Sequence, residues 1–200
     1  MKTTFLLINK KKKIIENINE TILSISKREF NKLIVPISAN LASIPLLRVI
    51  KKIKENFKLK KINIFEIGPG SGYFGIMNYI NGDKYISTEN SQAFYIWQNI
   101  LMRNFAKDND FFDYVYDELE NMKNQNLVHL PWWFFSNNNF MEKLDVDIII
   151  CEHAIAELDD NALRYLMKLS NFLLKDNISR HFIINNNYEL WEYTIYIYKK

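Results

Sequence analysis

Apolar residues recur at helical spacing in two segments near the start of the chain. The first segment, residues 11–26, carries isoleucine and leucine along one side, which predicts an amphipathic helix. The second runs from about Ser43 or Pro45 to Phe57, and Pro45 suits a first helical turn because its missing N–H would be unpaired there. We therefore expect residues 1–57 to form a helical cap and residues 58–200 to form a second unit.

From residue 61 onward, short apolar runs alternate with helical patterns, which indicates a parallel sheet flanked by helices. The clearest strand is 146–151, because a continuous run of Val and Ile is expected where both faces of a sheet are covered. The last run, 191–198, alternates aromatic and aliphatic residues and predicts an antiparallel strand. The expected fold is α/β: a Rossmann-like, mostly parallel sheet flanked by helices, with an N-terminal helical extension and a short C-terminal edge strand. The other expected strands are 62–67, 84–88, 127–130 and 180–185, and the expected helices are 73–80, 91–105 and 162–174.

The charge balance and the cysteine content argue against several classes of function. With 26 basic and 23 acidic side chains, the net charge of +3 is too even for a domain built around a nucleic-acid backbone, so no nucleic-acid partner is expected. The single cysteine, Cys151, excludes an internal disulfide and the ligand spacings of structural zinc sites. We expect no metal and a reducing, cytoplasmic location. No apolar run is long enough to span a bilayer, so no membrane partner is expected.

A glycine-rich segment follows the first expected strand. Gly68, Gly70 and Gly72 stand at alternate positions before a helix, and glycine is needed where a chain turns sharply and brings its backbone against a ligand. A dinucleotide site needs glycine at the first, third and sixth positions, and the sixth position here is Tyr73. The dinucleotide motif therefore fails, although an NAD-dependent oxidoreductase is kept as an alternative.

An acidic residue, Glu66, stands two positions before the first glycine. The pattern acidic-x-Gly-x-Gly-x-Gly resembles the first motif of class I S-adenosylmethionine-dependent methyltransferases. A carboxylate at this strand end can offset the sulfonium and ammonium charges of that cofactor, directly or through a water. Glu89, 17 residues after Gly72, ends the next strand, where a carboxylate can accept hydrogen bonds from both ribose hydroxyls. The alternative is that both acids are only polar residues at strand ends.

The resemblance covers about residues 35–185 and implies S-adenosyl-L-methionine as the cofactor. It also implies adenine contacts at His129 and Leu130, where the third of these strands ends. The residues that it places at the cofactor are Glu66, Gly68, Pro69, Gly70, Gly72, Glu89, Asn90, Leu130 and Cys151.

Residues 145–160 form an acid-led apolar strand followed by a polar loop and a short helix. This pattern is similar in particular to sugar O-methyltransferases, in which the loop lies next to the transferred methyl group. His153 can act as general base toward an acceptor hydroxyl, with Glu157 at i, i+4 spacing to orient it. In the alternative interpretation His153 only packs or caps a helix. These residue types and their spacing predict catalytic roles for His153 and Glu157, and the resemblance implies a small polar acceptor such as a sugar.

Two further features bear on the acceptor and on partners. The aromatic run 131–135 predicts either a wall for adenine or acceptor, or a part of the core. The class normally adds another helix and a strand pair after the fifth strand, whereas only some 15 residues follow here. A short edge strand favours pairing with a partner or a homodimer. A degenerate methyltransferase-like binding module is therefore a second alternative.

Overall fold

The computed structural model describes residues 2–33, 39–107, 109–136, 144–152, 154–174, 181–185 and 194–197. Seven strands lie in this part of the chain: β1 (Asn63–Ile67), β2 (Lys84–Glu89), β3 (Phe111–Asp113), β4 (Leu127–Pro131), β5 (Ile148–Glu152), β6 (His181–Asn185) and β7 (Thr194–Ile197). They form one sheet in the order β3-β4-β2-β1-β5-β6-β7. The first six are parallel, and β7 pairs antiparallel with β6 at the edge. The expected Rossmann-like sheet and its antiparallel edge strand are therefore confirmed.

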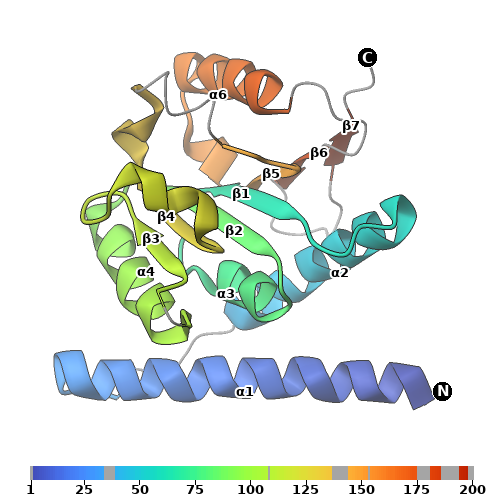
Figure 1. Ribbon diagram of the computed structural model, residues 1–200, viewed down its shortest axis with the longest axis vertical. Helices are drawn as coiled ribbons and strands as arrows, with labels where there is room; N and C mark the ends of the chain where they lie inside the picture. The colour runs from blue at the N-terminus through green and yellow to red at the C-terminus, as the bar shows by residue number, and fades with distance from the viewer. Residues whose placement is uncertain are drawn as a thin grey trace.

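Helices cover both faces of this sheet (Figure 1). On one face lie α2 (Ala39–Phe57), α3 (Tyr73–Ile80) and α4 (Gln92–Phe105), and on the other lies α6 (Asp160–Leu173). Three short 3₁₀ helices also lie in the described part of the chain: η1 (Leu119–Asn124) precedes β4, η2 (Trp132–Ser136) follows β4, and η3 (Ala154–Glu157) follows β5. Among the residues that the structure describes, no helix combines the length and the apolar character needed to cross a membrane.

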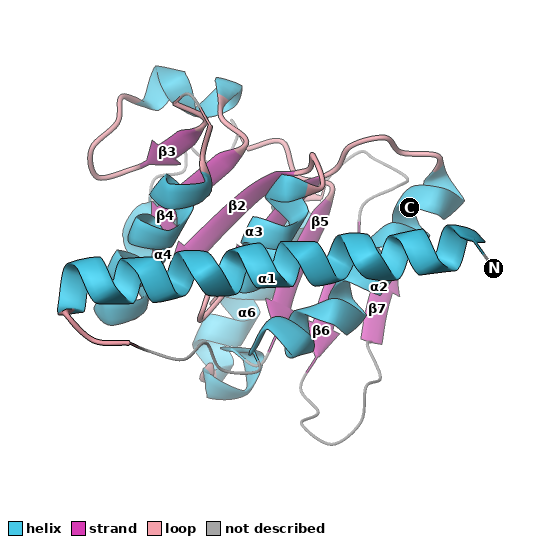
Figure 2. Ribbon diagram, turned by 90° about the horizontal axis from the view of Figure 1, so that it is seen from below, coloured by secondary structure: helices cyan, strands magenta, loops and turns pink. Residues whose placement is uncertain are grey.

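A long helix, α1 (Lys2–Phe30), crosses the α2–α4 side of the molecule and contacts α3 and α4 (Figure 2). Its contact side buries Ile18, Ile22 and Ile25, all at most 1% exposed. The helix begins nine residues before the expected start at residue 11. The apolar period marks only the buried part of a helix, whereas lysine is a good helix former and lets α1 continue through residues 10–13.

The expected position of Pro45 in a first helical turn is wrong. Helix α2 begins at Ala39, so Pro45 lies inside it. A proline there removes one intrahelical hydrogen bond, which costs stability. Leu46 and Ile50, which follow it, are at most 2% exposed in the core, and their burial offsets that cost.

Two apolar clusters fill the space on either side of the sheet. The first joins α1, α2, α3 and α4 to one face, and the second joins α6, η1 and η2 to the other. Successive strand residues alternate between them: Ile64 belongs to the first and Phe65 to the second. This alternation identifies the face on which each polar strand residue lies.

Strand β3 lies outside the expected strands, because an alternating pattern cannot be recognised in three residues. Ser91 stands at the N-cap of α4, yet its side chain makes no cap hydrogen bond. The Glu89 carboxylate accepts the backbone N–H groups of Asn90 and Ser91 instead, at 3.0 and 2.9 Å. At the start of α6, the Asp159 side chain accepts two backbone N–H groups at 2.8 Å.

Helix α3 approaches the sheet most closely at Gly75. A Cβ atom there would overlap the ring of Tyr85, which is fully buried on β2. The Tyr85 hydroxyl donates to the Glu66 carboxylate at the end of β1. Glycine at position 75 thus allows Tyr85 to lie under α3 and reach Glu66.

We expect Gly75→Ala to destabilise the protein by about 1–3 kcal/mol, the usual cost of overpacking a core. In a helix that is open at this position, the same change would stabilise by about 1 kcal/mol. The free energy of unfolding, measured by chemical denaturation, shows whether Gly75→Ala destabilises or stabilises the protein. In a Tyr85→Leu background the cost of Gly75→Ala should shrink, and an equal cost in both backgrounds would show that the ring is not the cause.

Candidate functional site

The sheet reverses its winding at β1, which lies between β2 and β5. In open parallel sheets the crevice for a ligand lies outside the carboxyl ends of the strands at this point. The glycine loop leaves β1 there, and η3 follows β5. A Cβ atom on Gly68 would lie 2.6 Å from Cβ of Ala154, so the two loops meet at the crevice.

The glycine loop has a backbone that favours glycine at three positions. Gly68, Gly70 and Gly72 have φ angles of +67°, +54° and +75°. The Gly72 N–H donates to the Pro69 carbonyl at 3.0 Å and closes the turn. A Cβ atom on Gly70 would meet no atom within 4 Å, so this part of the loop faces open space that a ligand can occupy.

Helix α4 fixes the loop through two adjacent side chains. Nε2 of Gln98 donates to the Gly70 carbonyl at 2.7 Å, and Nε1 of Trp97 donates to the Ser71 carbonyl at 3.1 Å. Gln98 also lies 3.2 Å from Oε2 of Glu89 and so links the loop to the end of β2. Sequence reasoning missed Gln98. The available signal was a polar residue on the same helical stripe as the buried Leu101 and Met102.

Glu89 is 5% exposed and accepts three N–H groups of its own chain. Oε1 accepts from the Asn90 and Ser91 backbones, and Oε2 accepts from Gln98. Because a carboxylate has about four acceptor positions, one position is left for a ligand hydroxyl. The structure therefore brings Glu89 and the glycine loop together, and it also gives Glu89 a structural role at the start of α4.

Glu66 is 4% exposed and lies on the same face of the sheet as Tyr85 and Glu89. Burial, and then the Glu66 charge, raises the pKa of Tyr85 well above its ordinary value, so this hydroxyl stays protonated and donates to the carboxylate. The second carboxylate, Glu89, acts on Tyr85 in the same direction. Both acids are thus within electrostatic reach of one buried hydroxyl.

A row of polar side chains crosses four neighbouring strands on this face, in register. Its members, from β3 to β1, are Asp113, His129, Ser87 and Glu66. All four are at most 4% exposed. A buried polar row needs partners, and α4 and β2 supply several of them, including the Tyr85 hydroxyl for Glu66 and Asn99 for His129.

His129 is neutral in this row. Its Nδ1 lies 2.6 Å from Oδ1 of Asn99, and its ring stacks on Tyr95 with 4.1 Å between the centroids. Burial lowers the pKa of His129 to about 3. His129 and Leu130 are fully buried, and Leu130 belongs to the apolar cluster under α6. The side chains of both residues at which adenine contacts are expected are thus enclosed by the protein.

Cys151 is likewise fully buried in the cluster under α6. Burial, and then the nearby Glu66 charge, raises the pKa of Cys151 to about 12, so almost no thiolate is present at neutral pH. The thiol therefore behaves as a small apolar side chain. If Cys151 contacts a ligand, its backbone and not its thiol would make the contact.

The expected catalytic pair is only partly described. His153 lies outside the described residues. Glu157 is exposed at the end of η3, a 3₁₀ helix that begins at Ala154. The pairing of His153 with Glu157 therefore stays a prediction.

The aromatic run after β4 divides between surface and core. Trp132 and Trp133 are 59% and 45% exposed, whereas Phe134 is fully buried. The Trp133 ring contacts Tyr114 edge-on, with 5.0 Å between the centroids. Within the described ranges, no three His, Cys, Asp or Glu side chains gather closely enough to hold a metal ion.

No model of a known protein family matches the chain, and no curated protein matches it. Among solved structures it is similar to the methyltransferase domain of bacterial CtHen1, with 12% identity and a TM-score of 0.48 over 70% of this chain and 64% of that chain. It is similar to MtNAS in complex with MTA and tNA, with 13% identity and a TM-score of 0.47 over 90% and 57% of the two chains. It is also similar to the glycopeptide N-methyltransferase MtfA complexed with S-adenosyl-L-homocysteine, with 11% identity and a TM-score of 0.42 over 67% and 47%. The matches thus cover 47% to 64% of those three chains.

The pH dependence of stability should report the buried, neutral His129. Its pKa is about 3 in the folded chain against an ordinary value of 6.5, so the unfolded chain binds more protons between these values. Stability should therefore fall as the pH drops through this window, by about 2 kcal/mol from this group at pH 5. Chemical denaturation of the wild type and of His129→Asn at pH 7 and pH 5 measures this change in the free energy of unfolding. The variant should lose less stability over this step, and parallel losses would contradict the burial of a neutral imidazole.

Proposed function

We propose that this chain binds S-adenosyl-L-methionine in the crevice at β1 and β5 and methylates an oxygen of a small polar acceptor such as a sugar. The observation that carries the proposal is the glycine loop itself. The loop has open space at Gly70, and two buried carboxylates, Glu66 on β1 and Glu89 on β2, lie on one face of the sheet toward the same ends of the strands.

The residues present fit that cofactor. The remaining acceptor position of Glu89 suits a ribose hydroxyl, and the negative charge of Glu66 suits a cationic ligand. Oε1 of Gln98 is buried and has no partner within the described part of the chain, so it offers a further acceptor beside the loop. When bound, the cofactor would supply an electrophilic methyl group. Glu66, Glu89, Gln98 and the glycine loop would hold the cofactor.

The same charges disfavour a pyrophosphate. Two buried carboxylates near the loop would repel a dinucleotide, and Tyr73, a buried residue of α3, stands where the third dinucleotide glycine would be. The NAD-dependent alternative is therefore the weaker one.

One observation favours the second candidate, a methyltransferase-like binding module without a cofactor. Glu89 already accepts three N–H groups of its own chain, and Glu66 accepts the Tyr85 hydroxyl. Both acids can thus be explained by folding alone. Cofactor binding separates this candidate from the enzyme.

Calorimetric titration with S-adenosylhomocysteine and with NAD tests the cofactor. We expect saturable binding of S-adenosylhomocysteine and none of NAD. Gly70→Leu should weaken this binding more than tenfold, because its side chain enters the open space. Gly82→Leu is the matched control, since Gly82 also has a positive φ and open space around its Cβ position but lies in the turn before β2. Binding of NAD alone, or equal losses in both variants, would contradict the proposal.

The chemical step rests on His153, whose role stays a prediction. If His153 removes the acceptor proton, His153→Ala should leave the affinity for S-adenosylhomocysteine unchanged and lower turnover about 10²-fold. Transfer of a labelled methyl group to a panel of sugars measures turnover. Near-normal turnover of the variant would assign methyl transfer to alignment alone.

A further inference from the structure

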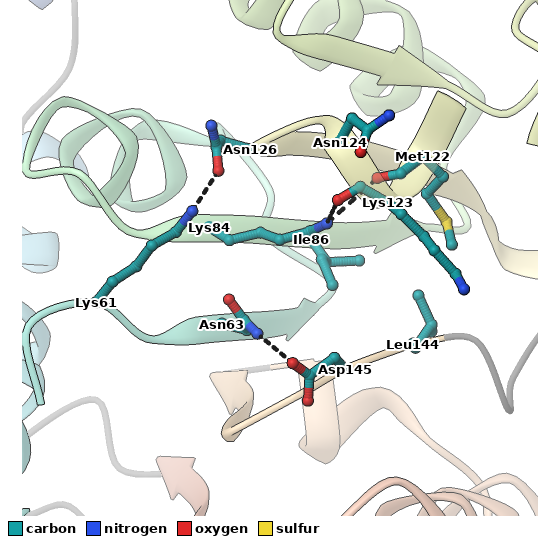
Figure 3. Close-up of a pocket in the computed structure, with 10 residues that line it drawn as sticks. All are labelled: Lys61, Asn63, Lys84, Ile86, Met122, Lys123, Asn124, Asn126, Leu144 and Asp145. Carbon is teal, nitrogen blue, oxygen red and sulfur yellow. Dashed lines mark hydrogen bonds between the residues drawn. The ribbon is translucent and has the colours of Figure 1, made fainter. Parts of the chain in front are cut away.

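A second candidate site lies at the opposite edge of the sheet, where the strands begin. A cavity of about 600 Å³ opens there between the starts of β1, β2 and β4 and the segment before β5 (Figure 3). Its polar lining includes Lys61, Asn63, Lys84, Lys123, Asn126 and Asp145. The five residues of β1 separate it from the glycine loop by about 15 Å, so it is not a part of the crevice.

Lys84 is half-buried in this cavity, and its ammonium donates hydrogen bonds to neutral groups. Its ammonium donates to the carbonyl oxygens of Met122 and Lys123 at the end of η1, each at 3.2 Å. An ammonium has three N–H groups, so one donor is left. Burial, and then Lys61, lowers the pKa of Lys84, against the opposite effects of Asp145 and Asp110. Asp145 and Asp110 thus act on the Lys84 ammonium from beyond ion-pair distance.

Lys61 is also bound by a neutral group. Its ammonium donates to Oδ1 of Asn126 at 2.5 Å. Over the described ranges, neither Lys61 nor Lys84 comes within 4.0 Å of a carboxylate. Two ammonium groups that repel one another thus line one cavity without an ion pair.

The nearby acids accept hydrogen bonds from amide groups. Asp110 accepts the backbone and side-chain N–H groups of Asn126 at 2.7–3.0 Å. Asp145 accepts Nδ2 of Asn63 at 3.0 Å. Figure 3 shows the Asn63–Asp145 pair on the side of β1 and β5, whereas the two ammonium groups point toward β4 and η1. The cavity therefore has a cationic wall and, across from it, a wall of amide and carboxylate oxygens.

We propose that this cavity binds a sugar phosphate, with the phosphate held between Lys61 and Lys84 and sugar hydroxyls held by Asn63 and Asp145. Phosphate is a natural partner of lysine ammonium groups, and carboxylate and amide oxygens accept hydroxyl hydrogens. The volume lies in the usual range for small-molecule sites. The apolar side chains of the lining, Ile86, Met122 and Leu144, are at most 8% exposed. They offer little surface to a ligand, which disfavours an apolar one. This site does not depend on the function proposed for the crevice.

Calorimetric titration of the full chain with glucose 6-phosphate tests the site, with inorganic phosphate and glucose as the two comparison probes. We expect saturable binding of glucose 6-phosphate, weaker binding of phosphate and none of glucose. Lys61→Met and Lys84→Met should each weaken the binding of glucose 6-phosphate at least tenfold. Lys52→Met, at an exposed lysine of α2, is the matched control and should leave it unchanged.

Two further variants test the two walls separately. Asp145→Ala should weaken the binding of glucose 6-phosphate but not that of inorganic phosphate, because the change removes an acceptor for a sugar hydroxyl and keeps both lysines. Lys84→Arg keeps the positive charge and covers the case in which Lys84→Met does not fold. It should bind more tightly than any Lys84 variant without charge, and circular dichroism checks the fold of each variant.

Several results would overturn the proposal. If the binding of glucose 6-phosphate does not saturate at millimolar concentration, the cavity is not a binding site for it. Equal affinity for phosphate and glucose 6-phosphate would indicate an adventitious anion site only. Equal losses in Lys52→Met and Lys61→Met would indicate general charge attraction. Amide shifts in nuclear magnetic resonance that gather at the glycine loop rather than at β2 and η1 would place the ligand in the crevice.

Discussion

The hydrogen bond between Tyr85 and Glu66 connects the packing of the fold to its candidate site. A carboxylate buried at the end of β1 needs a donor, because an unpaired buried charge is strongly unfavourable. The Tyr85 ring that supplies this donor fits under α3 because the helix has no side chain at Gly75. One contact therefore links the position of α3 on the sheet to the acid before the glycine loop.

Helix α4 has the same double role on the other side of the loop. Gln98 holds the Gly70 carbonyl and the Glu89 carboxylate at once, while Glu89 accepts the N–H groups that begin α4. The loop is thus fixed before any ligand arrives, and a ligand does not have to order it. The same contacts give Glu89 a structural role at the start of α4 that needs no ligand.

The sequence predicted those features that repeat along the chain or that need a particular residue type. The alternation of strands and helices and the glycine loop, with its acid at Glu66, belong to this group. Pairs that meet only after folding have no local signal: Gln98 is 28 residues from Gly70, and Asn63 is 82 residues from Asp145. Strand β3 is too short for a period, and burial of the following residues overrides the local preference of Pro45.

Helix α1 has a consequence for how the chain folds as it is synthesised. Helices α3 and α4, which α1 contacts, come later in the sequence, and α4 ends at Phe105. Chains leave the ribosome from the N-terminus at about 5–20 residues per second, so the stripe of Ile18, Ile22 and Ile25 emerges several seconds before its docking surface. During that interval the stripe is open to chaperones and to other nascent chains. Docking of α1 is therefore a late event, and a slowly translated stretch before Phe105 would prolong the exposure of the stripe.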